Sequence, residues 1–224
     1  MRRQQYKRWL CLGVWSFILA GVLSAHGLEE AAESPLAIIR ATVERSMEVL
    51  KDPAYRGDEN FQKRIEKLEE VVLPRLDALE FGRRCLGVHW QKLSDPQRQE
   101  FIDLVKELIE KTYGGILDRY PEEVRFSYDA ERIDGAFAEV ETKADNSSLK
   151  RRFSIVYRLN LKDGKWLIYD VVAENVSMVR NYRNQFSRIL DKSSYEELAQ
   201  ALRRKIQQLE TAPTSNSTRD RENG

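Results

Sequence analysis

Hydrophobic side chains recur every three or four residues between positions 34 and 120, which is the spacing of amphipathic helices. This pattern predicts four helices, the first of them over 35–51. Each is preceded by a polar residue that suits a helix N-cap, and these residues are Ser34, Asn60, Asp77 and Ser94. Gly87 and Pro121 are expected to end the third and fourth helices, because glycine and proline interrupt helices.

After Pro121 the hydrophobic period falls to two, which indicates β-strands. Four antiparallel strands in a meander are expected. The connections predicted between them are Asp134-Gly135, a polar loop over 145–148, and Asp163-Gly164. The fourth strand, 166–172, is apolar on both faces and is therefore expected inside the sheet or beneath a helix.

The rest of the chain predicts two more helices and a polar end. One helix is expected over 176–190, and Ser194 should open the last one. Residues 211–224 contain almost no hydrophobic side chains and are expected to form a disordered tail. Helices before and after a meander make one α+β domain, which should span 28–210.

Residues 1–27 have the features of a secretory signal peptide. Four basic residues precede an apolar run over 9–20, and Ala25-His26-Gly27 has the small-x-small pattern of a cleavage site. The run is shorter than the ~20 apolar residues that cross a bilayer comfortably. Cleavage is expected after Gly27, with cleavage after Ala25 and an uncleaved membrane anchor as the alternatives.

Composition adds two limits to this picture. With 224 residues, of which 42% are hydrophobic, the chain can bury one sizeable core. The net charge of the whole chain is +1. The signal segment contains four basic residues and no acidic ones, so the rest of the chain has 33 basic and 36 acidic residues and a net charge of −3. This mildly acidic balance offers no electrostatic reason to expect nucleic-acid binding.

The sequence lacks the motifs of several classes of enzyme. The sequence has no G-x-S-x-G, no P-loop, no H-E-x-x-H and no paired cysteines, so no cofactor or metal site is expected. Beyond the signal segment Cys85 is the only cysteine, which rules out an internal disulfide, and it is expected to be a plain buried residue. His89 is the only histidine there and is expected in a loop, at the surface or an interface.

One enzymatic alternative remains open at this stage. In a small isomerase with a cone-shaped sheet, Asp170 could handle a proton together with Tyr157 or Tyr169. A structural interpretation competes with it, because a carboxylate near a strand end commonly accepts hydrogen bonds from backbone N–H groups of the next helix.

The sheet pattern also raises the possibility of a cavity. Strand three is expected to present large side chains such as Phe153, Ile155 and Tyr157 to the inner face, opposite small ones such as Ala138 and Val140. Small side chains opposite large ones can pack tightly or leave volume for a ligand. The sequence pattern is compatible with both.

Four motifs closely resemble the MlaC family, the periplasmic phospholipid-binding component of the Mla system, also known as the toluene-tolerance auxiliary family. They are F-G-R-R-C-L-G-V-H-W (81–90), F-x-x-L-x-x-E-L-x-x-x-T-Y (101–113), W-L-I-Y-D-V-V-A-E-N-V-S (166–177) and N-Y-R-N-Q-F (181–186). The resemblance extends over about 35–209. Asn175 stands where the family is expected to have glycine, and since asparagine tolerates a left-handed backbone, the turn should be preserved.

The resemblance implies a monomeric periplasmic carrier with an NTF2-like α+β fold, in which a curved sheet and the helices enclose an apolar cavity. It would shuttle glycerophospholipid between an outer-membrane lipoprotein complex and an inner-membrane ABC transporter with an MCE-domain protein, and so maintain outer-membrane lipid asymmetry. It would not be an enzyme. The alternatives are a periplasmic interaction module whose cavity is filled by its own side chains, and the small isomerase.

Eight residues are the candidate lipid-binding residues, seven of them in the lining of that cavity and Tyr182 near its mouth. They are Leu104, Leu108, Val140, Phe153, Ile155, Tyr157, Val171 and Tyr182. If Val140 faces the lipid, Val140→Glu should reduce lipid retention more than it affects folding, because water can hydrate the carboxylate once the cavity is empty.

Overall fold

The computed structural model describes residues 33–117, 124–147 and 150–211. Its elements, in chain order, are α1 (Pro35–Lys51), the 3₁₀ turns η1 (Pro53–Tyr55) and η2 (Asp58–Asn60), α2 (Phe61–Val72), η3 (Leu73–Arg75), α3 (Ala78–Leu86), η4 (Gly87–Lys92), α4 (Asp95–Leu117), β1 (Val124–Asp134), β2 (Phe137–Asn146), β3 (Arg151–Lys162), β4 (Lys165–Ala173), β5 (Val176–Ser177), α5 (Met178–Leu190) and α6 (Tyr195–Thr211). The predicted α+β order of elements is confirmed. The signal segment, Pro121 and residues 212–224 lie outside the described ranges.

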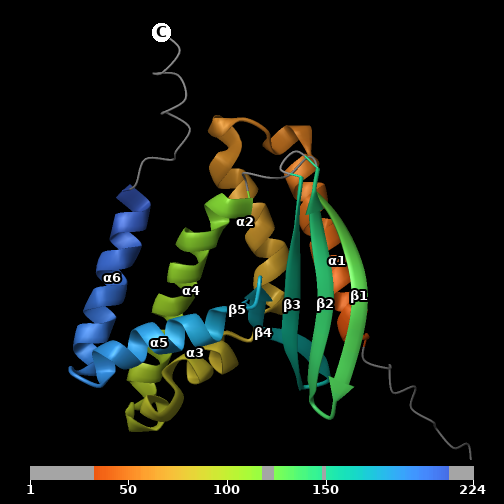
Figure 1. Cartoon of the computed structure of the whole chain (residues 1–224). Helices are drawn as coiled ribbons and strands as arrows, with labels where there is room; N and C mark the ends of the chain where they lie inside the picture. Colours follow the sequence, from red (N-terminus) through yellow and green to blue (C-terminus); the bar gives the residue numbers. More distant parts are fainter. Residues whose placement is uncertain (1–32, 118–123, 148–149, 212–224) are drawn as a thin grey trace, which may run out of the picture. The chain divides into compact units, whose positions relative to one another are not determined.

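The strands form one antiparallel sheet in the order β1-β2-β3-β4-β5. Val140 of β2 pairs with Tyr157 of β3, which in turn pairs with Val171 of β4. Helix α1 packs on one face of this sheet and runs behind β1, β2 and β3 in Figure 1. The alternation predicted for β2 is confirmed, because Ala138, Val140 and Thr142 are all buried.

The sequence predicted four strands and a helix that begins at residue 176. Both predictions were wrong about residues 176 and 177. Residues 176–177 form a short fifth strand on β4, and α5 begins at Met178. The turn before it holds Glu174 and Asn175 at φ 48° and 65°, the left-handed geometry expected for Asn175. The hydroxyl of Ser177 then accepts a hydrogen bond from the backbone N–H of Arg180, so the helix begins one residue after this cap.

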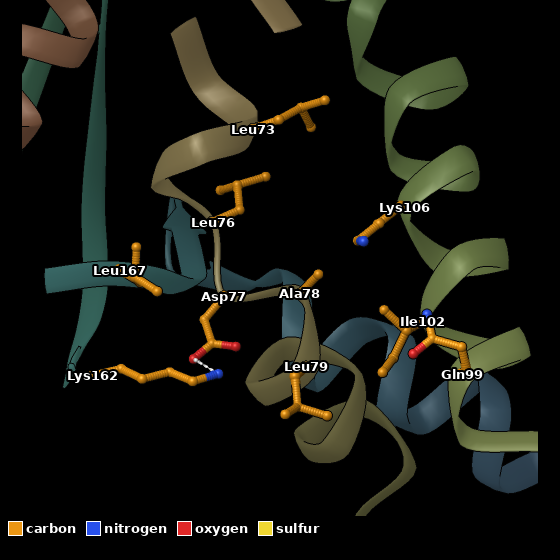
Figure 2. Close-up of a pocket in the computed structure, with 10 residues that line it drawn as sticks. All are labelled: Leu73, Leu76, Asp77, Ala78, Leu79, Gln99, Ile102, Lys106, Lys162 and Leu167. Atoms are coloured by element: carbon orange, nitrogen blue, oxygen red, sulfur yellow. Dashed lines mark ion pairs between the residues drawn. The ribbon is translucent and has the colours of Figure 1, made fainter. Parts of the chain in front are cut away.

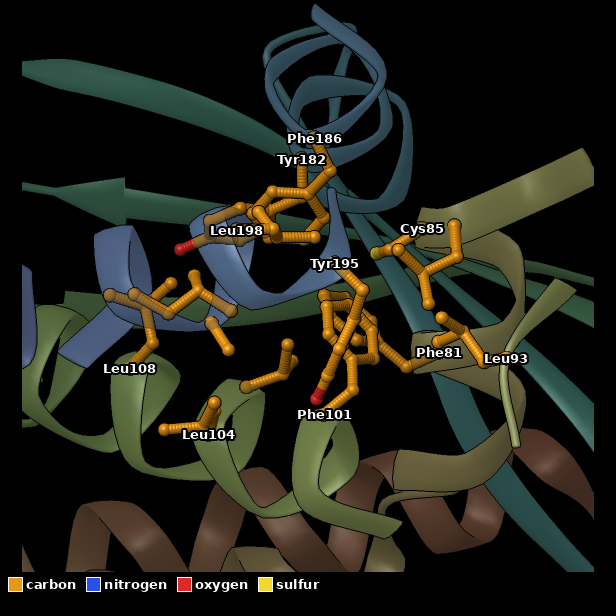
Figure 3. Close-up of a cluster of buried hydrophobic side chains, with 14 of the residues drawn as sticks. Phe81, Cys85, Leu93, Phe101, Leu104, Leu108, Tyr182, Phe186, Tyr195 and Leu198 are labelled. Atoms are coloured by element: carbon orange, nitrogen blue, oxygen red, sulfur yellow. The ribbon is translucent and has the colours of Figure 1, made fainter. Parts of the chain in front are cut away.

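The largest group of buried side chains joins the helices on the other side of the molecule. It is shown in Figure 3 and lies where α4 packs against α6 and α3 packs against α5. Tyr182 stacks on Phe186 with 5.5 Å between ring centroids, and Phe186 meets Phe101 edge to face. Cys85 is fully buried in this cluster, as predicted, and burial raises the pKa of its thiol.

Four local predictions need correction. Strand β2 continues through 145–146, where a loop was expected, and Thr211 is the last residue of α6 and not part of the tail. Asn60 precedes α2 but does not cap it, because its side-chain amide donates to the carbonyl of Arg56. His89 is buried in η4, not at the surface, with its Nε2 3.3 Å from a carboxylate oxygen of Asp191.

A glycine at the end of α3 provides a test of the fold. Gly87 has φ 56° and ψ −123°, a backbone geometry that residues with a Cβ rarely adopt. Gly87→Ala is therefore expected to lower the free energy of unfolding by about 1–3 kcal/mol in a denaturant titration. The matched variant is Gly82→Ala in the same helix, where a Cβ would meet Phe101 at an ordinary 3.5 Å. Gly82→Ala should raise the free energy of unfolding by about 0.5–1 kcal/mol. If both variants changed it equally, the argument from the backbone geometry of Gly87 would be wrong.

Candidate functional site

An apolar cavity of about 350 Å³ lies between α1, the α2–η3 segment, α4 and strands β3 and β4. Its volume is within the range of small-molecule sites, ~300–1,000 Å³. Helix α1 contributes five lining residues, which are Thr42, Val43, Ser46, Met47 and Leu50. The part of α1 nearer its N-terminus, with Ile38 and Ile39, packs on the sheet, so only the later turns face the cavity.

The polar groups on this wall are already satisfied. The hydroxyl of Thr42 donates to the carbonyl of Ile38 at 2.7 Å, and that of Ser46 donates to the carbonyl of Thr42 at 2.8 Å. Hydroxyls bonded one turn back along their own helix need no partner in the cavity. This part of the wall therefore suits a ligand without hydrogen-bonding groups.

The opposite wall is a connecting segment fixed to the sheet. Leu73 and Leu76 line the cavity, and Leu76 forms a bridge with Ile168 of β4. The backbone N–H of Asp77 donates to the carbonyl of Ile168 at 2.8 Å, and the Asp77 carboxylate caps α3 by accepting from the N–H of Glu80. These bonds hold an otherwise irregular stretch in place as a wall.

The sheet contributes Phe126 from β1, Tyr157 from β3, and Ile168, Tyr169, Asp170 and Val171 from β4. The pairing of β3 with β4 shifts register between Arg158 and Leu159. This bulge allows Ile168 and Val171, three residues apart, to face the same side. Burial raises the pKa of Tyr157 to about 12, so its phenol is neutral at physiological pH.

A second hollow, of about 460 Å³, adjoins the apolar cavity. The two share five lining residues, which are Leu73, Leu76, Asp77, Ala78 and Lys106. Figure 2 shows that Lys106 extends from α4 toward the Leu76–Ala78 stretch, with Lys162 on the far side of Asp77. The second hollow therefore shares Lys106 and Asp77 with the apolar cavity and adds Lys162 and the exposed Leu79.

The structure distributes the eight candidate lipid-binding residues over several places. Tyr157 and Val171 line the cavity. The other six lie outside its described lining: Leu104, Leu108 and Tyr182 are in the helical cluster, Val140 is packed between the sheet and α1, and Phe153 and Ile155 lie earlier on β3 and are partly buried. Contact of any of the eight with a lipid remains a prediction.

The sequence pattern missed the lining from α1 and the neighbouring side of α4. On α4, Val105 and Ile109 line the cavity and also contact the helical cluster, whereas Leu104 and Leu108, one residue earlier, belong to the cluster and lie outside the cavity lining. All four lie in the hydrophobic stripe recognised in the sequence. The stripe was the available signal, but it does not show which side faces a cavity and which side faces another helix.

Asp170, the candidate base of the isomerase alternative, has a structural role. One carboxylate oxygen accepts from the backbone N–H of Val179 at 3.0 Å. The other accepts from the hydroxyl of Ser177 at 2.7 Å and from Arg158 at 3.2 Å. The buried carboxylate thus ties β4 to the start of α5, as the structural interpretation predicted.

We expect Asp170→Asn to destabilise the protein by about 1–3 kcal/mol, because an amide cannot accept all three of these hydrogen bonds. Thermal and denaturant unfolding would measure the change. Asp163→Asn, which removes the same charge in the exposed β3–β4 turn, should stay within about 0.5 kcal/mol of wild type. A wild-type unfolding curve for Asp170→Asn would show that the carboxylate is not structural.

Within the described ranges, no three His, Cys, Asp or Glu side chains come together as a potential metal site. In the same part of the chain, no helix is both long enough and apolar enough to cross a membrane.

Comparison with known proteins places these features in a family. The chain is 24% identical over 192 residues to the intermembrane phospholipid transport system binding protein MlaC of Haemophilus influenzae, covering 82% of this chain and 89% of that protein. Its fold is similar to that of a phospholipid-binding protein from Ralstonia solanacearum solved in complex with a phospholipid, with a TM-score of 0.72, 24% identity, and 80% of this chain and 99% of the other covered. The family model described as MlaC protein matches residues 40–204. Since that match includes most of the chain, and the motifs in the sequence indicate the same family, the protein belongs to the MlaC family.

Proposed function

We propose that this protein is a periplasmic carrier that holds a glycerophospholipid with its acyl chains in the apolar cavity and moves it between the outer and inner membranes. The observation that carries the proposal is the cavity wall, which is apolar and whose α1 hydroxyls are bonded to their own helix. The names of the two related proteins, one a transport-system binding protein and the other a phospholipid-binding protein, support it.

The energetics of lipid transfer explain why such a carrier needs an enclosed site. A two-chain lipid has about 30 methylenes, each stabilised by ~0.8 kcal/mol when buried, so leaving a bilayer unaided costs on the order of 25 kcal/mol. An enclosed cavity can offset this cost by keeping the chains away from water. A shallow surface patch would leave most of the chains hydrated.

The carrier has no catalytic role in this proposal. Its partners would be an inner-membrane ABC transporter with an MCE-domain protein and an outer-membrane lipoprotein complex. Because the sequence has no P-loop, any net direction of transport would come from the ATPase of the transporter. Such traffic would maintain the lipid asymmetry of the outer membrane.

The test is to extract and identify the ligand. The mature protein would be purified from the periplasm without detergent, and native mass spectrometry is expected to show a phospholipid bound in stoichiometric amounts. The purified protein should also move labelled phospholipid from donor to acceptor vesicles. A protein that is empty after purification, and stays empty after incubation with vesicles, would contradict the proposed function.

A further inference from the structure

The second hollow is more polar than the apolar cavity, because it adds Lys162 to the Lys106 and Asp77 that both share. Among its lining residues are two lysines, Lys106 and Lys162, and one carboxylate, Asp77. Leu73 and Leu79 at the same hollow are 47% and 44% exposed, so it opens to solvent. It thus provides a polar, net positive opening next to an apolar interior, which is the arrangement that an amphiphile requires.

The two lysines differ in how they are held. The Nζ atom of Lys162 lies 3.6 Å from a carboxylate oxygen of Asp77. That carboxylate also accepts from the side-chain amide of Asn160 at 3.0 Å and caps α3, so Asp77 is fixed and in turn positions Lys162. In Figure 2, Lys162 approaches Asp77 from the side opposite Lys106.

Lys106 has no ion pair or hydrogen bond among the described residues, and its side chain is exposed. It lines both hollows, and Figure 2 shows it projecting from α4 toward the Leu76–Ala78 stretch. The neighbouring polar residue on α4, Gln99, donates its amide to Asp103 at 3.1 Å and 3.2 Å, which leaves Lys106 as the uncommitted cation at this opening.

From this geometry we infer that Lys106 and Lys162 form a subsite for the phosphodiester of the bound lipid, and that the subsite favours a net anionic headgroup over a zwitterionic one. The inference rests on the proposed function and adds a headgroup preference to it. Two lysines against one carboxylate leave a single positive charge, which one phosphodiester neutralises. A headgroup that carries its own ammonium would add a cation beside two lysines, whereas a glycerol headgroup would not.

The test is a competition between two lipids with the same acyl chains. Delipidated protein would be loaded from vesicles made of equal parts phosphatidylglycerol and phosphatidylethanolamine, and the bound lipids would be counted by mass spectrometry. Wild type should be enriched in phosphatidylglycerol. Lys106→Gln should lower the ratio of phosphatidylglycerol to phosphatidylethanolamine by about two- to fivefold, the range for one partly exposed charge pair, and Lys106→Glu should lower it further.

The matched control is Lys63→Gln, which makes the same change on the exposed face of α2 outside both hollows. Its lipid ratio should equal that of wild type. Lys106 has no partner in the described structure whose loss would disturb folding, so the melting temperature of Lys106→Gln should not change.

The outcomes separate this inference from the proposed function. Absence of any bound lipid in wild type would contradict the function itself. Normal lipid occupancy with the same headgroup ratio in wild type and Lys106→Gln would overturn the inference alone. Co-sedimentation with phosphatidylglycerol vesicles distinguishes bound cargo from a bilayer surface: if Lys106→Gln weakens sedimentation and leaves the bound-lipid ratio unchanged, the lysine recognises the membrane and the inference is wrong.

Discussion

Replacing Val140 with glutamate is expected to unfold the protein, lowering the free energy of unfolding by more than about 4 kcal/mol. Val140 is 0% exposed and packs with Ile38, Ile39 and Leu159 between the sheet and α1. It does not line the apolar cavity, so water that fills an empty cavity would not reach the new carboxylate. A buried charge without a partner consumes a large part of a typical stability of 5–15 kcal/mol.

Circular-dichroism melting and co-purified phospholipid should be measured on the same sample. Val140→Ala serves as the control, because it leaves a small void without a charge and should cost only about 1–3 kcal/mol. If Val140→Glu melts like wild type but loses its lipid, Val140 must face the ligand, as the strand pattern alone had suggested.

The second large effect is expected from filling the cavity itself. Ser46 lines it from α1, and its side chain is small. Ser46→Trp should place an indole in the space that the acyl chains would occupy and reduce bound phospholipid at least about tenfold, a loss of ~1.4 kcal/mol or more. Because the ring enters empty volume and not a packed core, the melting temperature should remain near that of wild type.

Two control variants test whether the volume of the indole causes the loss of bound lipid. Ser46→Ala removes the hydroxyl without filling space and should retain wild-type lipid. Arg45→Trp puts the same ring at an exposed position next to it on α1 and should also retain lipid. Retention of lipid by Ser46→Trp would show that the acyl chains lie elsewhere.

Local patterns in the sequence predicted most elements of the fold. Caps such as Ser34 and Asp77 act through hydrogen bonds to residues three positions away, and two-residue turns such as Asp163-Gly164 depend on the backbone preferences of their own residues. The strand β5 was missed because two residues are too few to show a period. They become a strand only by pairing with β4.

The position of the cavity depends on contacts between distant parts of the chain. An α-helix turns about 100° per residue, so although Leu104 and Val105 belong to one buried cluster, only Val105 also lines the cavity. Whether an apolar side chain contacts only packed helices, as Leu104 does, or also an empty space, as Ile109 does, is decided by where α6, α1 and the Leu73–Ala78 stretch are placed. The sequence by itself therefore determined most of the elements, the buried Cys85 and the family. Only the tertiary structure decided which apolar side chains enclose the cavity, because long-range contacts such as Asp77 with Ile168 position its walls.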